Sequence, residues 1–135
     1  MIREAGEGKG KTRMQSYRDL LVWQKAMELV VAIYRITRGF PKRKVYGLAS
    51  PMQRPAVSIS LNIAEGHSLK QTPAYLRHLA IACGSLSELE TQIEISDRLG
   101  YLPPNEKSII VQTNDIGRML TGLRQSLRAK ISAEP

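Results

Sequence analysis

The stretch over residues 57–66 carries the most informative hydrophobic pattern in the chain, because its apolar and polar residues alternate. Alternation alone would indicate a strand. However, Ser58, Asn62 and Glu65 stand at i, i+4 and i+7, so on a helix they form one narrow polar stripe. A helix that is apolar around most of its circumference is typical of a bundle interior or a subunit contact. The pattern therefore predicts a central helix, which Gly66 ends by supplying a position with positive φ.

A second helix is predicted upstream of it, over residues 17–38. Ser16 and Asp19 have the spacing of a capping box at its start, and Gly39 followed by Pro41 marks its end. Its apolar face is wide enough to be buried on two sides, as when a helix contacts both its own bundle and a neighbouring subunit. A broad core face in a monomer is the alternative that the pattern leaves open. The residues expected to contact another subunit are Trp23, Met27 and Tyr34.

Proline and glycine mark the limits of the other helices. Ser50 and Pro51 resemble an N-cap followed by proline at the first helical position, and Thr72 with Pro73 repeats this signal. Pro55 lies one turn into its helix, so a kink or a loosened first turn is expected there. The predicted helices cover residues 51–65, 73–99 (closed by Gly100) and 104–130.

Four helices with three short connections and no convincing strand predict an all-α fold, an up-down-up-down antiparallel four-helix bundle. A chain of 135 residues forms one domain. We expect a flexible basic tail over residues 1–15, the bundle over 16–131 and a C-terminal tail over 132–135. Whether the first tail is a basic arm that touches nucleic acid or a leader segment stays open.

Composition narrows the class of protein. The formal net charge is +8, from 20 Lys+Arg against 12 Asp+Glu, which favours an anionic partner, although such charge can also serve solubility alone. A single cysteine excludes an internal disulfide framework and a zinc motif. No apolar run is long enough to cross a membrane, and the N-terminus lacks the core of a signal peptide, so a cytoplasmic protein is expected.

The charge divides unevenly along the chain. Residues 20–63 carry seven basic and one acidic residue, whereas residues 78–120 carry three basic and six acidic ones. In the predicted topology the two termini and the second connection share one end of the bundle, and the first connection lies at the other. Neither end carries a base-reading motif, so we expect contacts to the RNA or DNA backbone. The candidate nucleic-acid-binding residues are Arg13, Arg18, Lys70, Arg77, Arg124, Arg128 and Lys130 at the terminal end, and Lys42, Arg43 and Lys44 at the other.

Polar residues on the second and third helices are expected to hydrogen-bond to one another and fix the helix register. The sharper alternative, Glu65 and Glu88 acting as a catalytic carboxylate pair, is disfavoured because the helix rise separates them by roughly 20 Å within one subunit. His78 is expected to face Asn62 or to lie at the surface. We predict no catalytic residue, no metal site and no cofactor. The predicted structural seam comprises Ser58, Asn62, Glu65, Ser85 and Glu88.

Several short segments resemble one known family. They are WQKA over residues 23–26, FP over 40–41, YGL over 46–48, SxxxNIAEG over 58–66, ACGSLSEL over 82–89 and LGYL over 99–102. Over about residues 17–127 the chain resembles the bacterial four-helix-bundle proteins first noticed as reading frames in intervening sequences of large-subunit ribosomal RNA genes. It is also similar in fold to accessory variability proteins of diversity-generating retroelements.

The resemblance implies a homopentameric, barrel-like assembly with a basic surface, no catalytic activity, and RNA or DNA binding. Lys44, Pro51, Pro55 and Ser60 depart from the family pattern, so the path of the second helix is the least certain part of the likeness. We therefore expect a non-enzymatic, nucleic-acid-associated homo-oligomer. The alternative is an accessory scaffold that binds a reverse transcriptase and its RNA. An enzyme is disfavoured because no nucleophile–base pair or ligand set is present.

Overall fold

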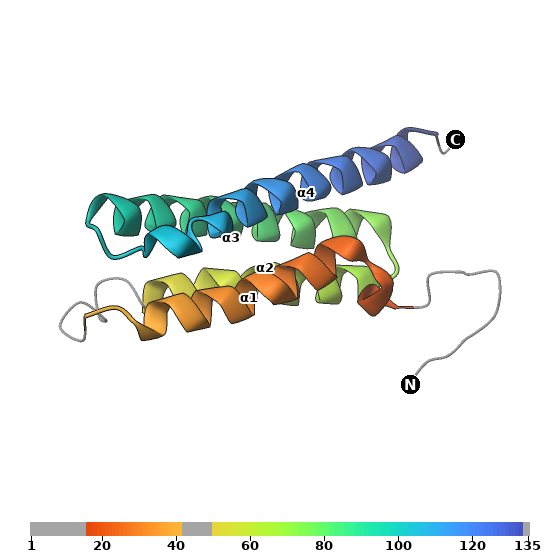
Figure 1. Cartoon of the computed structure of the whole chain (residues 1–135). Helices are drawn as coiled ribbons and strands as arrows, with labels where there is room; N and C mark the ends of the chain where they lie inside the picture. Colours follow the sequence, from red (N-terminus) through yellow and green to blue (C-terminus); the bar gives the residue numbers. More distant parts are fainter. Residues whose placement is uncertain (1–15, 42–49, 134–135) are drawn as a thin grey trace.

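A computed structural model describes residues 16–41 and 50–133 of the chain. In these residues four long helices follow one another in antiparallel order, and no strand occurs (Figure 1). Helix α1 packs against α2 and α4, and α3 packs against the same two helices. The predicted all-α, up-down-up-down four-helix bundle is confirmed. Its elements are η1 (Tyr17–Asp19), α1 (Leu21–Arg38), α2 (Ser50–Ser68), α3 (Thr72–Arg98), η4 (Pro104–Glu106) and α4 (Ser108–Ala133).

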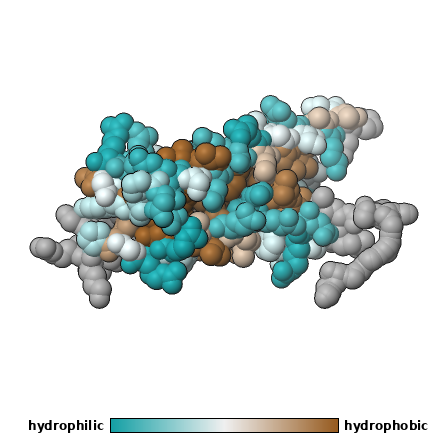
Figure 2. All heavy atoms as spheres, in the orientation of Figure 1, coloured by the Kyte–Doolittle hydropathy of each residue, from teal (hydrophilic) through white to brown (hydrophobic). Residues whose placement is uncertain are grey.

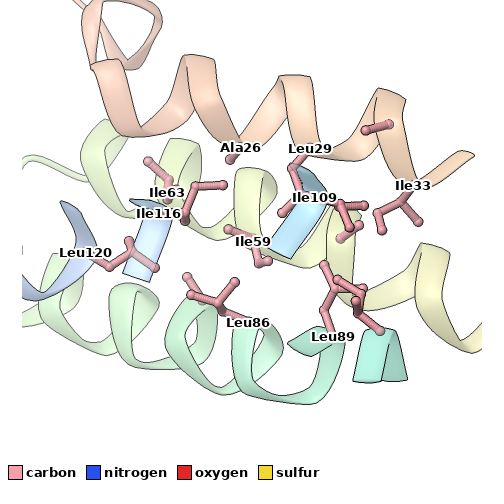
Figure 3. Close-up of a cluster of buried hydrophobic side chains, with 14 of the residues drawn as sticks. Ala26, Leu29, Ile33, Ile59, Ile63, Leu86, Leu89, Ile109, Ile116 and Leu120 are labelled. Atoms are coloured by element: carbon pink, nitrogen blue, oxygen red, sulfur yellow. The ribbon is translucent and has the colours of Figure 1, made fainter. Parts of the chain in front are cut away.

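The core lies along the bundle axis, and all four helices contribute side chains that point toward one another (Figure 3). Leu29, Ile59, Leu89 and Leu120 are fully buried there. Burial of each such side chain contributes about 1.5–3 kcal/mol. On α1, the part of the apolar face that contacts this core is formed by Ala26, Leu29, Ile33 and Ile36.

The capping box at Ser16 forms as predicted, but it caps a 3₁₀ turn rather than the long helix. The Ser16 hydroxyl accepts a hydrogen bond from the Arg18 amide at 3.0 Å, and the Asp19 carboxylate accepts one from the Ser16 amide at 3.4 Å. The chain then turns at Leu20, so α1 begins at Leu21 instead of residue 17. The short turn places Tyr17 and Arg18 beside the start of α1.

The prediction that Gly66 ends its helix was wrong. Helix α2 continues to Ser68, and the left-handed backbone position after it is Lys70, with φ of 55°. Gly66 has a packing role instead, because a Cβ added there would lie 2.8 Å from the Cβ of His78 and 2.9 Å from Cδ1 of Tyr75. The absence of a side chain therefore allows α2 and α3 to approach closely.

The other predictions about the helices, including their limits and the effect of Pro55, can be compared with the structure. Pro55 lies inside α2 and the helix is continuous through it, since only the carbonyl of Pro51 in the first turn loses its helical donor. Gln71, not Thr72, is the N-cap of α3. Gly100 closes α3 as predicted, with φ of 79°. Helix α4 starts after η4 and reaches Ala133, beyond the predicted end of the bundle.

The close approach at Gly66 gives the first testable prediction. Gly66→Ala should lower the free energy of unfolding by about 1–3 kcal/mol, because the added methyl group meets the Cβ of His78 and forces the helices apart. Chemical denaturation followed by circular dichroism measures this change.

Gly84→Ala is the matched control, since a Cβ at this helical position meets nothing within 4 Å. It should be neutral or stabilise the protein by up to about 1 kcal/mol. Equal effects of the two substitutions would contradict the packing role of Gly66.

Candidate nucleic-acid interface

The turn η1, the α2–α3 connection and the last turns of α4 lie at the same end of the bundle (Figure 1). Exposed basic residues occur in each of these segments and in the first turns of α3. We call this end of the bundle the basic end. It is the end to which the sequence assigned the larger group of candidate residues. Of that group, the exposed residues that the structure describes are Arg18, Lys70, Arg77, Arg128 and Lys130.

Arg18 is held in place by two aromatic rings. Its Cζ lies 5.5 Å from the ring centroid of Tyr17 and 5.6 Å from that of Trp23, and the two rings meet edge to face at 5.2 Å. Both distances are within the range of cation–π attraction. Trp23, which we expected at a subunit contact, therefore takes part in this cluster, and the Arg18 charge is positioned before any ligand binds.

His67 does not add to the charge of the basic end. Burial, together with the neighbouring Lys70, lowers the pKa of His67, so its ring is neutral at neutral pH. The ring packs edge-on against Tyr75, with centroids 5.7 Å apart. The positive field at this end thus comes from Lys and Arg alone.

Arg124 is placed differently from the other candidates. One of its guanidinium nitrogens donates to Sγ of Cys83 at 3.4 Å, and its Nε is buried with no hydrogen-bond partner in the described residues. The side chain thus lies over the space between α3 and α4. Cys83 is partly buried there.

At the opposite end of the bundle three described cations are paired with carboxylates, whereas Arg38 and Arg54 make no ion pair with the described residues. Arg35 on α1 donates to Glu106 of η4 at 2.9 Å, and Lys107 lies 3.5 Å from Asp97. The hydrogen bond from Arg35 lowers the pKa of the Glu106 carboxyl. The predicted contacts Arg13, Lys42, Arg43 and Lys44 lie outside the described residues. Within the described chain, the basic end therefore holds the larger group of unpaired cations.

Hydrogen bonds between α2 and α3 join three of the five residues of the predicted seam. Ser58 accepts from Nδ2 of Asn62 at 3.1 Å and from the hydroxyl of Ser85 at 2.8 Å. Oδ1 of Asn62 lies 2.9 Å from Nδ1 of His78. Because the Asn62 amide nitrogen already donates to Ser58, its oxygen faces His78, and Nδ1 of the ring carries the hydrogen that is shared.

The two acidic members of the predicted seam lie apart from this network. Glu65 is at its margin, with Oε1 3.7 Å from Nδ1 of His78. Glu88 is exposed on α3 and makes no hydrogen bond or ion pair with the described residues. Glu65 and Glu88 therefore do not lie together in one site. The seam serines bond to each other and to Asn62, so neither has an adjacent base.

An apolar strip crosses the outer surface of α1 and α2. Met27, Val31 and Tyr34 on α1 and Val57 and Leu61 on α2 have between 38% and 63% of their surface exposed. A hydrogen bond from Nε2 of Gln53 to Oγ1 of Thr37, at 3.0 Å, fixes the register that brings the two groups together. We use the name apolar strip for these five residues.

The surface of the strip is hollowed. Tyr34, Val57 and Leu61, together with Arg54, line a shallow hollow of about 430 Å³. Met27 and Tyr34 are thus available for the subunit contact predicted for them. Elsewhere too, on the face seen in Figure 2, hydrophobic residues reach the surface between hydrophilic ones.

Residues 16–41 and 50–133 contain neither a cluster of metal ligands nor a membrane-spanning helix. No group of three or more His, Cys, Asp or Glu side chains is arranged to hold a metal ion there. None of the described helices has the length and apolar character needed to span a bilayer.

Comparison with known proteins identifies the family of the chain. A family model described as 23S rRNA-intervening sequence protein matches residues 18–122. The chain belongs to this family. The match covers α1 to α3, the seam and the apolar strip, whereas Arg124, Arg128 and Lys130 lie beyond it.

One solved structure has the same fold as this family member. It is a crystal structure at 1.70 Å of a protein of unknown function from the S23 ribosomal protein family of Bacteroides thetaiotaomicron VPI-5482. The TM-score is 0.68 at 22% sequence identity, and the alignment covers 77% of this chain and 98% of the other. At this identity the likeness shows the fold alone. No curated protein matches the chain.

The hydrogen-bonded seam gives the second prediction. Asn62→Ala should lower the free energy of unfolding by about 1–3 kcal/mol, because it leaves polar groups of Ser58 and His78 without their partner in a largely buried position. Glu88→Ala should change it by less than about 0.5 kcal/mol, since Glu88 is exposed. Urea titration of both variants makes the comparison, and a larger loss for Glu88→Ala would overturn this description of the seam.

Proposed function

We propose that the protein is a non-enzymatic, homo-oligomeric nucleic-acid-binding protein of the cytoplasm, and that its basic end holds the phosphate backbone of RNA or DNA. One observation carries the proposal. The exposed cations Arg18, Lys70, Arg77, Arg128 and Lys130 lie at one end of the bundle and make no ion pair with the described residues. At the other end Arg35, Arg98 and Lys107 are paired with carboxylates, so that only Arg38 and Arg54 among its described cations make no ion pair.

Unpaired lysine and arginine side chains are what backbone binding requires. Each contact to a phosphate releases condensed counterions, so affinity rises with the number of contacts and falls steeply with salt. The described part of the chain has no helix-turn-helix or other base-reading element, so recognition without strong sequence preference is expected. The 23S rRNA in the name of the family accords with an RNA partner.

Assembly into a homo-oligomer would multiply the contacts. The apolar strip supports self-association, because five large apolar side chains at least 38% exposed would be costly to leave in water. The family resemblance implies five subunits. In a closed ring each subunit presents the same basic end, so several weak phosphate contacts combine into one tight interaction.

Charge reversal at the basic end tests the proposed site. Arg77→Glu combined with Arg128→Glu should weaken binding at least about tenfold at low salt and lower the salt slope by about two. Fluorescence anisotropy of a labelled hairpin RNA and a labelled DNA duplex, each measured over a series of NaCl concentrations, gives both quantities.

Arg38→Glu with Arg98→Glu is the matched control, since it makes the same change in charge with exposed residues at the other end. This control should retain at least half of the wild-type affinity. If it instead abolishes binding while the first variant binds normally, the site belongs at the opposite end. If the wild-type protein binds neither probe, the proposal fails, and the alternative of a scaffold that acts only with a partner protein takes its place.

A further inference from the structure

A long groove lies between α3 and α4. Two adjoining hollows of about 390 and 770 Å³ follow the two helices and share Glu90 and Asn114 in their walls. Ile93 lines the first hollow and Leu86 the second, and both side chains are buried. We call this feature the α3–α4 groove.

Small residues of α4 keep the groove open. Gly117, Thr121 and Gly122 line it, and a Cβ added at Gly122 would meet no atom within 4 Å. Helices α3 and α4 therefore leave between them a space that neither of them fills. The floor of this space is apolar, while Glu90 and Asn114 provide a polar wall.

The groove carries a carboxylate that lacks a partner. Glu90 makes no hydrogen bond or ion pair with the described residues, although Glu94 nearby is paired with Arg98 and Asp97 with Lys107. Burial raises the pKa of the Glu90 carboxyl, so its ionised form is disfavoured in the isolated subunit. An opposite charge brought into the groove would relieve this cost.

The apolar strip has the complementary properties. Arg54 lines the hollow between Tyr34, Val57 and Leu61, is exposed, and makes no ion pair with the described residues. The longer segments that contain these two surfaces have net charges of the same signs. Residues 20–63, which include the strip, carry a net charge of +6, and residues 78–120, which include most of the groove, carry a net charge of −3. The strip thus combines exposed apolar side chains with a cation that makes no ion pair, and the groove combines an apolar floor with a carboxylate that makes none. The cations that also line the groove have other partners, since Arg98 is paired with Glu94, Arg118 with Asp115, and Arg124 donates to Cys83.

We propose that the α3–α4 groove receives the apolar strip of a second copy of this chain, with Arg54 of one copy facing Glu90 of the next. This inference rests on the homo-oligomer of the proposed function and names the two surfaces that form it. Strip against strip would bring two Arg54 side chains together across a two-fold axis, and groove against groove would do the same for Glu90. A head-to-tail contact avoids both repulsions.

The bundle geometry lets such a contact repeat. Because α1 packs on α2 and α4, and α3 on the same two helices, the α1–α2 and α3–α4 faces lie on opposite sides of the subunit. Each copy can therefore use its strip toward one neighbour and its groove toward the other. A contact between two different surfaces of this kind closes into a ring when the rotation per subunit allows it.

A charge swap tests the pairing. Arg54→Glu and Glu90→Arg should each weaken self-association at least about tenfold, because each places like charges at every contact. The double variant should regain the assembly, since opposite charges then face each other again at every contact. Sedimentation velocity over a range of concentrations measures the assembly, and circular dichroism shows that each variant is folded.

Lys25→Glu and Glu28→Arg are the matched controls, because these exposed residues pair with each other on α1 and line neither surface. They should assemble as the wild type does. If the wild type assembles and the two test variants assemble equally well, or the double variant stays dissociated, the pairing of strip and groove is wrong although the homo-oligomer stands. A monomeric wild type would overturn both.

The nucleic-acid site is tested separately from the subunit contact. The double variant should bind the labelled RNA with the wild-type affinity, since its net charge and its basic end are unchanged. Weak RNA binding by a fully assembled double variant would place Arg54 or Glu90 in the nucleic-acid site and would contradict their assignment to the subunit contact.

Discussion

The packing of α2 against α3 is the constraint on which the rest of the molecule depends. At one end of this helix pair Gly66 leaves room for Tyr75 and His78. In the middle, Ser58 and Ser85 share a hydrogen bond of 2.8 Å. Such bonds can form in only one register, because a slip of one residue would bury polar groups without partners. The apolar core stabilises the bundle, and the seam fixes how its two central helices align.

This alignment decides what the surface presents. It places the α2–α3 connection at the same end of the bundle as η1 and the last turns of α4, and these segments form the basic end (Figure 1). It also turns Val57 and Leu61 outward on α2, next to Tyr34 of α1. The surface proposed to bind nucleic acid and the surface proposed for self-association thus depend on the same helix pairing, and they lie on different parts of the subunit.

The topology of the bundle and several of its details could be predicted from the sequence. Helical periodicity predicted the wide apolar face of α1, and Gly100 closed α3 as predicted. Gly66 was misread, because a glycine that ends a helix and a glycine that admits a neighbouring helix look the same in one sequence. Its packing role depends on His78, which lies across the helix interface. The continuity of α2 through Pro55 also depends on its position in the first turns.

The candidate site was predictable only in part, for a related reason. Counting charges placed Arg18, Lys70 and Arg77 in one group, and the structure shows that they are exposed at one end. The sequence did not reveal that Arg35 is neutralised, since its partner Glu106 is 71 residues away. Nor did it reveal that Arg124 turns toward Cys83. Pairing between distant residues requires the three-dimensional fold, and it decides which charges remain free.

The central claim is that one subunit leaves an apolar strip that another copy must cover. The molar mass of the purified wild-type protein in solution tests this most directly, measured by light scattering after size-exclusion chromatography at low and high salt. The account predicts a single species with a mass several times that of the 15.1 kDa subunit, and one that persists at high salt because the contact is largely apolar. A mass of 15.1 kDa at every concentration and salt would contradict it.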